Sequence, residues 1–290
     1  MTAEGSRGNQ GLRVIVYSML PPGLQAGLRW IARHDHRLLL VVTTAGPANR
    51  RNTLYREIVA MLPPEQDILI TGRMRRPISL LRSLSPDLIL SFGFPYRIPP
   101  EVTAIPRLGA YNLHPAPLPS YRGPNPMRMF YDVAPVLGAT LPRTEEDFDT
   151  GPILSRQERP MPAAITPETV LPLWMDAIGT ALEEGLSRAI NGEIGTPQDH
   201  AQATYAAEFH EDEHWLDWSL PNRTLQARAT ALNFFRPVTR ARIDGTEYGV
   251  TRLTPVSSAS AAGAPGTLLD RVDGAFRIST ADGVVEVTTA

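Results

Sequence analysis

The chain has 290 residues, and its 42% hydrophobic and 20% charged content is ordinary for a globular protein of roughly two domains. The absence of cysteine excludes disulfides, thiolate metal sites and a cysteine nucleophile. All 28 basic residues are arginine, which excludes lysine Schiff-base chemistry and a P-loop lysine, and the net charge of −2 provides no global attraction for nucleic acid.

Local features of the chain predict its location and its surface charge. No apolar run approaches the roughly 20 residues that cross a bilayer, and the N-terminus, Met1 to Gln10, is polar. We therefore expect a cytoplasmic protein without a membrane segment, and no cluster of histidines and carboxylates indicates a metal site. Five arginines are candidates for a basic patch, which we interpret as a solvated surface rather than a phosphate-binding face. They are Arg50, Arg51, Arg73, Arg75 and Arg76.

The first part of the chain alternates short apolar runs with helix-compatible segments. The runs are Leu12 to Tyr17, Arg37 to Thr43, Asp67 to Ile70 and Leu88 to Ser91. Their continuous apolar character is typical of strands covered on both faces, which predicts an α/β domain with an open, mostly parallel twisted sheet and flanking helices. The turn after the first run, Ser18 to Gly23, lacks the G-x-G-x-x-G spacing of dinucleotide-binding proteins, so a nicotinamide cofactor is not expected.

Three more strands and a long helix are predicted in the middle of the chain. The strands are Gly109 to Leu113, Val136 to Leu141 and Ile153 to Arg159, with a proline-rich loop over 115–126 after the first. Thr166 has the position of a helix N-cap, because a proline follows it at the first helical position. Apolar residues at helical spacing then extend this helix to about Gly192.

The C-terminal part is predicted to be a second, smaller domain. A polar stretch with Gly, Pro and Gln makes 195–205 the linker between a larger domain over 1–194 and a C-terminal domain over 206–290. We expect the latter to be a small OB-like β-barrel with one helix and a low-complexity loop. Its elements are a helix near Asn222 to Leu232, strands at Val238 to Ile243, Tyr248 to Leu253, Phe276 to Ser279 and Val284 to Val287, and the loop Ser257 to Gly266.

Three polar side chains stand where this architecture places a site. Asn112 and His114 lie two apart at the end of a predicted strand, so both point to one face near the carboxyl edge, where open α/β sheets bind ligands. The amide can donate to a developing oxyanion, the imidazole can move a proton near neutral pH, and Asp149 can hold the imidazole in one tautomer. Taken singly, each residue also fits a structural role as a strand cap, a backbone partner or a turn start. Together they suit transfer of an acyl group to an amine.

The sequence around these residues resembles a known family. Asn-Leu-His-Pro from position 112, Leu-Pro-Ser-Tyr-Arg-Gly-Pro-Asn-Pro from 118, Gly-Ala-Thr from 138 and Asp-Thr-Gly-Pro-Ile-Leu from 149 occur in this order. They resemble the formyltransferases that use 10-formyltetrahydrofolate, which include glycinamide ribonucleotide, methionyl-tRNA and sugar N-formyltransferases. The C-terminal motifs Leu-Asp-Trp-Ser from 216 and Ala-Leu-Asn from 231 resemble the appended barrel of the methionyl-tRNA branch. The resemblance implies the formyltransferase fold, N-formyltransferase activity, and Asn112, His114 and Asp149 as catalytic residues.

The resemblance also implies where the formyl donor binds. The family holds the pterin mainly through backbone groups and apolar walls, which here are segments 90–97 and 143–149. The first segment combines two phenylalanines with a glycine, which suits a flat ring close to the backbone, although the phenylalanines fit a core equally well. The implied donor-binding residues are Leu90, Ser91, Phe92, Gly93, Phe94, Pro95, Arg143, Glu145 and Asp147, and the implied substrate loop is Tyr121, Arg122 and Gly123.

Departures from the family pattern bear on the acceptor. The early Gly-Thr-Pro turn and the basic insertion of the methionyl-tRNA enzymes are replaced by residues 18–21 and 44–53, and Pro142 stands where glycinamide ribonucleotide enzymes have a histidine. Residues 206–290 hold eight arginines against eleven acidic residues, which disfavours tRNA. We therefore expect a small amine or hydroxylamine, such as an amino sugar nucleotide or a hydroxyornithine-type precursor. Methionyl-tRNA formylation, hydrolysis of 10-formyltetrahydrofolate and a non-catalytic folate-binding module stay open as alternatives.

Overall fold

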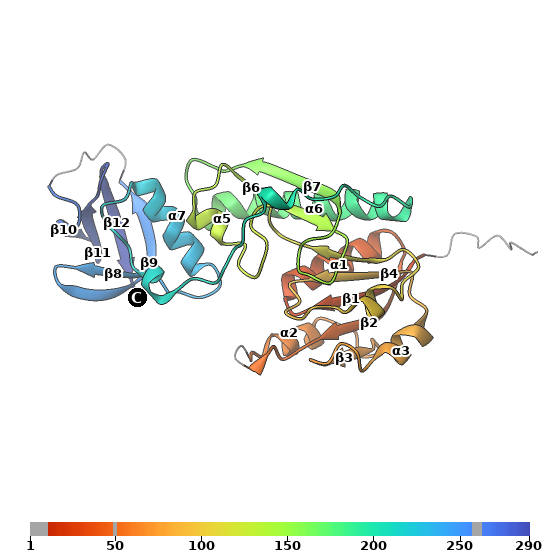
Figure 1. Ribbon diagram of the computed structural model, residues 1–290. Coiled ribbons are helices and arrows are strands. Elements are labelled where there is room, and N and C mark those ends of the chain that lie inside the picture. Colours follow the sequence, from red (N-terminus) through yellow and green to blue (C-terminus); the bar gives the residue numbers. More distant parts are fainter. Residues whose placement is uncertain (1–10, 49–50, 257–262) are drawn as a thin grey trace, which may run out of the picture. The chain divides into compact units, whose positions relative to one another are not determined.

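The structure is a computed structural model that describes residues 11–48, 51–256 and 263–290 (Figure 1). The polar N-terminus, Arg50 and residues 257–262 of the low-complexity loop lie outside the described residues. The chain divides into two compact units, which are described separately. Unit 1 comprises Met1–Pro119, Ala139–Gln157 and Ile178–Ala203, and unit 2 comprises Ser120–Gly138, Glu158–Ala177 and Thr204–Ala290. The limits 1–194, 195–205 and 206–290 stay a prediction.

Unit 1 is built on a five-stranded parallel sheet with the strand order β3-β2-β1-β4-β5. The strands are β1 (Arg13–Ser18), β2 (Arg37–Thr43), β3 (Ile68–Ile70), β4 (Leu88–Phe92) and β5 (Ala110–Leu113). Every residue of β4, and all but the first of β1, is buried, which explains the uninterrupted apolar runs. The predicted open parallel sheet is confirmed. Because β1 pairs with both β2 and β4, the strand order reverses beside β1.

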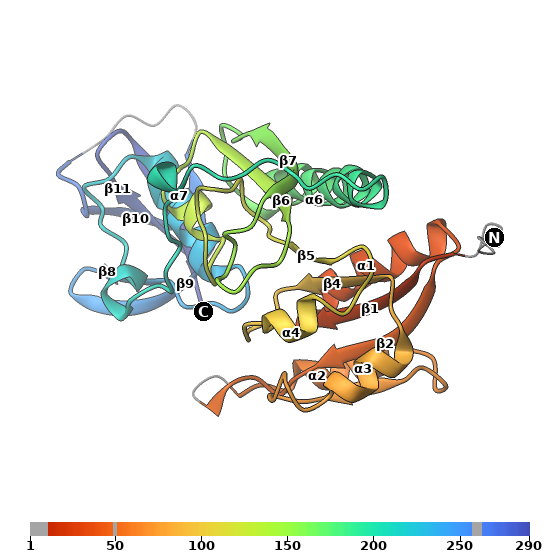
Figure 2. The ribbon, with the colours of Figure 1, turned by 45° about the vertical axis from the view of Figure 1, so that its right-hand side comes forward.

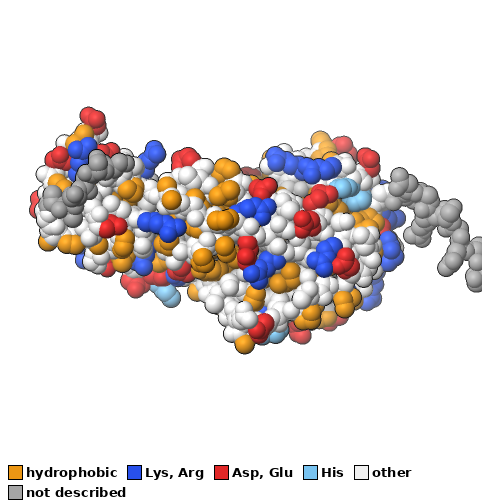
Figure 3. All heavy atoms as spheres, turned by 90° about the horizontal axis from the view of Figure 1, so that it is seen from above, with side chains coloured by type: hydrophobic (Ala, Val, Ile, Leu, Met, Phe, Trp, Pro, Cys, Tyr) orange, Lys and Arg blue, Asp and Glu red, His pale blue; other side chains and the backbone are white. Residues whose placement is uncertain are grey.

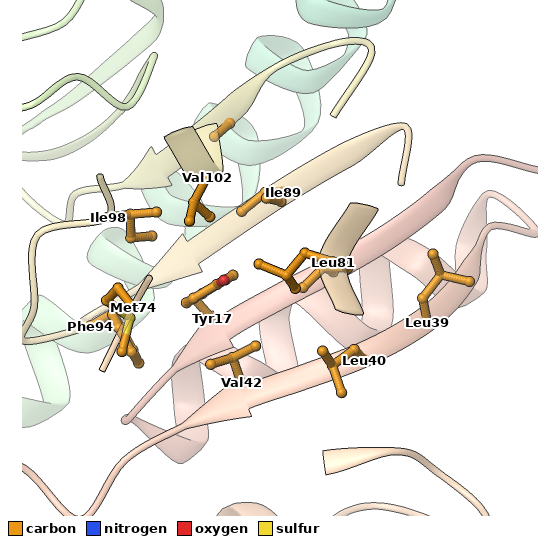
Figure 4. Packing of buried hydrophobic residues seen from close by; sticks show 12 residues of the cluster. Tyr17, Leu39, Leu40, Val42, Met74, Leu81, Ile89, Phe94, Ile98 and Val102 are labelled. Carbon is orange, nitrogen blue, oxygen red and sulfur yellow. The ribbon is translucent and has the colours of Figure 1, made fainter. Parts of the chain in front are cut away.

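Helices cover both faces of this sheet, as Figure 2 shows for α1 and α3. The helices between its strands are α1 (Pro21–Arg33), α2 (Leu54–Ala60), α3 (Ile78–Leu84) and α4 (Pro100–Thr103). On one face, Leu81 of α3 and Val102 of α4 pack over Tyr17 and Ile89 of the central strands (Figure 4). All four side chains are fully buried, so this cluster forms the core that holds β1 and β4 in place.

Three elements contribute residues to both units. They are β6 (Val136–Pro142), β7 (Ile153–Pro160) and α6 (Pro167–Ile190). The two strands form a sheet of their own. These strands and the long helix are confirmed, with the helix ending at Ile190 rather than Gly192. A 3-10 helix, η2 (His200–Gln202), lies in the segment predicted to be the linker.

Unit 2 is built on a five-stranded antiparallel sheet with the order β10-β11-β12-β9-β8. Its elements are α5 (Arg128–Tyr131), η3 (Glu211–His214), α7 (Asn222–Asn233), β8 (Arg240–Ile243), β9 (Thr246–Pro255), β10 (Leu268–Val272), β11 (Ala275–Ser279) and β12 (Val284–Thr289). Leu225 of α7 packs against Ile278 and Val285 of the sheet, which confirms the predicted small barrel-like fold, with α7 as the α-helix among the described residues of 206–290. Sequence reasoning missed β10, because Asp270 and Arg271 interrupt the apolar pattern of this exposed edge strand.

Candidate active site

The three predicted catalytic side chains meet at the carboxyl end of β5, within unit 1. Asn112 Nδ2 donates to Oδ1 of Asp149 at 3.0 Å, and Oδ2 of Asp149 lies 3.4 Å from Nδ1 of His114. One carboxylate therefore contacts both the amide and the imidazole. The side chains of His114 and Asp149 are each 5% exposed, so water screens their interaction only weakly.

The neighbouring strand orients the amide of Asn112. Ser91 of β4 lies opposite Asn112 in the parallel register, and its hydroxyl donates to Oδ1 of Asn112 at 2.9 Å. Because the amide oxygen accepts from Ser91 while the amide nitrogen donates to Asp149, the hydrogen-bond network assigns the two ends of the amide. Ser91, which the resemblance implies as a donor-binding residue, thus also supports Asn112.

The chain after β5 is fixed by Thr140 of the Gly-Ala-Thr motif. The backbone of His114 exchanges two hydrogen bonds with the backbone of Thr140, at 2.9 and 2.8 Å. The buried Thr140 hydroxyl donates to the carbonyl of Ala116 at 2.8 Å and accepts from the amide of Leu118 at 3.0 Å. This pairing explains why a threonine two positions after a glycine accompanies the Asn-Leu-His motif, a link that the sequence alone did not reveal.

A tight turn presents Asp149 to its partners. Asp149 has φ of 60°, in the left-handed region that aspartate tolerates better than most residues. Gln198 Nε2 donates to the carbonyls of Asp149 and Gly151, at 2.8 and 2.7 Å, and Gln198 is buried. A Cβ on Gly151 would lie 2.1 Å from the carbonyl oxygen of Arg143. Sequence reasoning missed Gln198, because a single glutamine in a polar stretch rich in Gly and Pro carries no periodic or motif signal.

The first predicted donor segment is anchored in the core by its apolar side chains. Leu90, Phe92 and Phe94 are buried. Phe92 lies against α1, where a Cβ on Gly23 or Gly27 would come within 3 Å of it, and Phe94 packs edge-on against Tyr17 with the ring centroids 5.2 Å apart. The two phenylalanines are therefore core residues. Gly93 is exposed and Pro95 half-buried, so the segment presents its backbone at this place.

The second predicted donor segment lies beside the end of the first. Arg97 Nη2 is 2.9 Å from Oδ1 of Asp147, and its guanidinium lies 5.9 Å from the ring centroid of Phe148. Arg143, Glu145 and Asp147 are exposed. Phe148, which precedes Asp149 directly, is also an exposed aromatic residue. The structure thus brings the two donor segments together next to the carboxylate of the site.

The predicted substrate loop belongs to unit 2 and is held by residues of the predicted linker. The backbone N–H of Tyr121 donates to Oγ1 of Thr204 at 2.8 Å, and that of Arg122 donates to the carbonyl of Thr204 at 2.9 Å. The exposed ring of Tyr205 lies over Gly123, where a Cβ would be 2.5 Å from a ring carbon. Gly123 has φ of 105°, a further reason for glycine at this position. Sequence reasoning missed Thr204 and Tyr205, because their pairing is non-local.

The chemical groups of the site suit a reaction at a carbonyl carbon. An amide N–H can stabilise an oxyanion, and an imidazole held by a carboxylate can donate to the same oxygen or move a proton. Among the described residues, no group of three or more histidines, aspartates and glutamates is arranged to hold a metal ion. No helix in the described part of the chain is long and apolar enough to cross a membrane.

Comparison with known sequences gives an independent finding. Residues 32–185 match the family described as formyl transferase, and residues 209–290 match the formyl transferase C-terminal domain. A methionyl-tRNA formyltransferase of Pseudomonas putida (strain GB-1) is 28% identical over 94% of this chain and 89% of the relative. A methionyl-tRNA formyltransferase of Pseudomonas fluorescens (strain SBW25) is 30% identical over 88% of this chain and 81% of the relative.

Comparison with solved structures agrees on the fold. HypX from Aquifex aeolicus in complex with tetrahydrofolic acid has a TM-score of 0.64 and 20% identity, over 95% of this chain and 43% of the HypX chain, so this chain spans less than half of HypX. An N-formyltransferase from Helicobacter canadensis, in complex with folinic acid and dTDP-3-aminofucose, has a TM-score of 0.65 and 13% identity, over 96% of this chain and 100% of that chain. At these identities the likeness shows the fold.

Proposed function

The chain belongs to the formyl transferase family, and on this premise we propose that it transfers the formyl group of 10-formyltetrahydrofolate to an amine or hydroxylamine nitrogen. The observation that carries this proposal is the buried carboxylate of Asp149, which contacts both the Asn112 amide and the His114 imidazole. These are the groups that acyl transfer to nitrogen needs: an oxyanion donor, a proton carrier and a group that orients the carrier.

The proposed mechanism assigns one role to each side chain. Attack of the acceptor nitrogen on the formyl carbon forms a C–N bond and places negative charge on the formyl oxygen. The amide N–H of Asn112 and the protonated imidazole of His114 donate to that oxygen. Asp149 orients the imidazole and, through water, receives the proton that the acceptor nitrogen loses. When the bond to the folate nitrogen breaks, this proton passes to that nitrogen, so the overall transfer conserves charge.

The proposed donor site consists of segments 90–97 and 143–149. Three side chains of the first segment are buried in the core, which leaves its backbone, around the exposed Gly93, to contact the pterin. The exposed ring of Phe148 stands beside Asp149 and supplies an apolar surface for a flat ligand. The ion pair between Arg97 and Asp147 joins the two segments. These contacts support a donor whose reactive end lies near Asp149.

For the acceptor, we propose a small molecule such as an amino sugar nucleotide or a hydroxyornithine-type precursor. Residues 206–290, of which 209–290 match the formyl transferase C-terminal domain, contain eight arginines and eleven acidic residues. On the face shown in Figure 3, the described arginines are intermixed with acidic and hydrophobic side chains rather than gathered into one basic surface. Such a distribution gives few of the phosphate contacts on which tRNA affinity depends.

Methionyl-tRNA is the second candidate acceptor. The observation in its favour is that two relatives named methionyl-tRNA formyltransferase align with 94% and 88% of this chain, including the C-terminal domain. The two candidates differ in their dependence on salt, because a tRNA complex weakens steeply as salt displaces its phosphate contacts whereas a small amine complex does not.

The function is tested by incubating the protein with 10-formyltetrahydrofolate and one acceptor at a time. Amino sugar nucleotides, N-hydroxyornithine and methionyl-tRNA are the acceptors, tetrahydrofolate is followed by absorbance, and the acceptor is weighed by mass spectrometry. A gain of one formyl group on a small amine supports the proposal. A gain on methionyl-tRNA alone would refute the proposed small-molecule acceptor. Formate release without any acceptor would indicate a hydrolase, and folate binding without turnover would favour a non-catalytic module.

A His114→Ala variant tests the catalytic assignment. We expect its turnover to fall below detection while tetrahydrofolate binding, followed by fluorescence quenching, stays within about twofold, because the imidazole acts on the reacting carbonyl. Full activity in this variant would contradict the assignment.

A further inference from the structure

One buried amide beside the site plays no part in the proposed mechanism. Gln198 is 8% exposed, and its Nε2 donates to the carbonyl oxygens of Asp149 and Gly151, at 2.8 and 2.7 Å. An amide nitrogen carries two N–H donors, so this single group supplies one to each carbonyl. Gln198 thus contacts the backbone of the residue whose side chain holds the Asn112 amide and the His114 imidazole.

The turn at Asp149 needs an external partner to keep its shape. Asp149 has φ of 60°, a left-handed backbone that costs free energy in a residue with a Cβ. Such a backbone persists only where the surrounding structure fixes it. Because the carbonyl oxygens of Asp149 and Gly151 accept from one nitrogen, Gln198 ties two positions of the turn together.

The segment that carries Gln198 is itself fixed to the strand that follows the turn. Thr196 and Ile153 exchange two backbone hydrogen bonds, at 2.9 and 2.8 Å. Gly195 has φ of 85°, and a Cβ there would lie 2.9 Å from the carbonyl oxygen of Ile153, so the two segments approach closely. The first residues of the stretch predicted to be a linker therefore form a fixed support for the Gln198 amide.

The position of Asp149 matters because its carboxylate has two partners at once. Its Oδ1 accepts from Nδ2 of Asn112 at 3.0 Å, and its Oδ2 lies 3.4 Å from Nδ1 of His114. A shift of the turn by about 1 Å would break one of these contacts, and a displacement of this size can cost about 10²-fold in rate. We propose that Gln198 is a positioning residue, whose amide holds the Asp149 carboxylate where it contacts both partners. This inference rests on the proposed function.

The proposal is tested by Gln198→Met, which keeps most of the side-chain volume and removes both donors. We expect kcat for formyl transfer, to the acceptor that gains a formyl group in the test above, to fall about 10²-fold. The Kd of tetrahydrofolate, measured by fluorescence quenching, and the KM of the acceptor should stay within about threefold, because the lost donors act on Asp149. The matched control is Gln202→Met, at an exposed glutamine of η2 whose amide donates to Asp199, and it should keep the wild-type kcat.

A double-mutant cycle separates positioning from a general effect on the fold. The Asp149→Asn background has no carboxylate to position, so adding Gln198→Met should lower kcat by less than about threefold. A residue that only stabilised the fold would lower kcat by the same factor in both backgrounds. If Gln198→Met does not fold, Gln198→Asn replaces it, because this variant keeps the amide but retracts it by one methylene. Its loss of kcat, about tenfold, should likewise disappear in the Asp149→Asn background.

Each other outcome contradicts part of this account. A wild-type kcat in Gln198→Met would overturn the positioning role and leave the proposed function standing. Equal losses in the two backgrounds would show that Gln198 acts on the fold and not through Asp149. Weaker tetrahydrofolate binding at an unchanged kcat would place Gln198 in donor binding instead. Absence of formyl transfer by the wild-type protein to any acceptor would overturn the proposed function, and the role of Gln198 with it.

Discussion

Replacing Asp149 by asparagine separates the charge of this side chain from its shape. The two side chains have the same size, and asparagine also tolerates the left-handed backbone that Asp149 adopts with φ of 60°. The amide oxygen of Asp149→Asn can still accept from Asn112, as Oδ1 does at 3.0 Å in the wild-type protein. The contact with His114 Nδ1, 3.4 Å away, loses its negative charge. Asp149→Asn therefore removes the negative charge that orients the His114 imidazole, while the turn is preserved.

The expected loss follows from the position of the carboxylate. Asp149 is buried with His114, so its charge acts on the imidazole without strong screening. A positioned general acid–base pair contributes about 10²- to 10⁴-fold, and we expect kcat of Asp149→Asn to fall by this factor, roughly 3 to 5 kcal/mol in activation free energy. The thermal midpoint should change by no more than about 2 °C, since packing and most hydrogen bonds are retained.

The assay is steady-state formyl transfer to the acceptor identified above, with tetrahydrofolate binding and thermal unfolding measured on the same preparations. Asp212→Asn, at an exposed position of η3, is the control for loss of one negative charge. A variant that keeps more than a tenth of the wild-type kcat would refute the role of Asp149. A variant that unfolds at a much lower temperature would instead show that the carboxylate stabilises the turn.

Three further predictions concern stability. Gly151→Ala should lower the free energy of unfolding by about 2 kcal/mol or more in urea titrations, because its Cβ would lie 2.1 Å from the carbonyl oxygen of Arg143; an unchanged midpoint would contradict this. Tyr17→Phe should raise the free energy of unfolding by about 1 kcal/mol, since the buried Tyr17 hydroxyl has no hydrogen-bond partner among the described residues. A lower free energy of unfolding in this variant would show that the hydroxyl has a partner. Burial lowers the pKa of His36 from its ordinary 6.5, and the nearby His34 acts in the same direction. The unfolded chain therefore binds the His36 proton more readily than the folded chain. The contribution of His36 to the free energy of unfolding is complete above pH 6.5 and is lost as the pH falls through the lowered pKa. The decrease in the free energy of unfolding over this pH range should be smaller in His36→Asn.

The first domain was predictable because strands and their side-chain directions are local properties. Continuous apolar runs predicted the parallel sheet, and the two-residue spacing of Asn112 and His114 predicted that both side chains meet at the carboxyl end of β5. The contact of Asp149 with both was not predictable from spacing. It depends on a turn held by Gln198, which is separated from Asp149 by 49 positions and donates to its carbonyl. No periodic pattern encodes such a bond, and the surrounding polar residues predicted a linker instead.

Composition could not decide whether Phe92 and Phe94 line a ligand site or a core, because buried packing and ligand walls use the same residue types. The structure decides for the core, because the ring of Phe92 packs directly against the backbone of α1 at Gly23 and Gly27. Gly93 between the phenylalanines has φ of 54°, and a Cβ there would lie 2.3 Å from the side chain of Leu20. Side chains at this edge of β4 are therefore committed to packing. A flat donor at this edge would be recognised by backbone N–H and C=O groups. Because nearly every residue type carries the same backbone groups, the sequence does not reveal such a binding site.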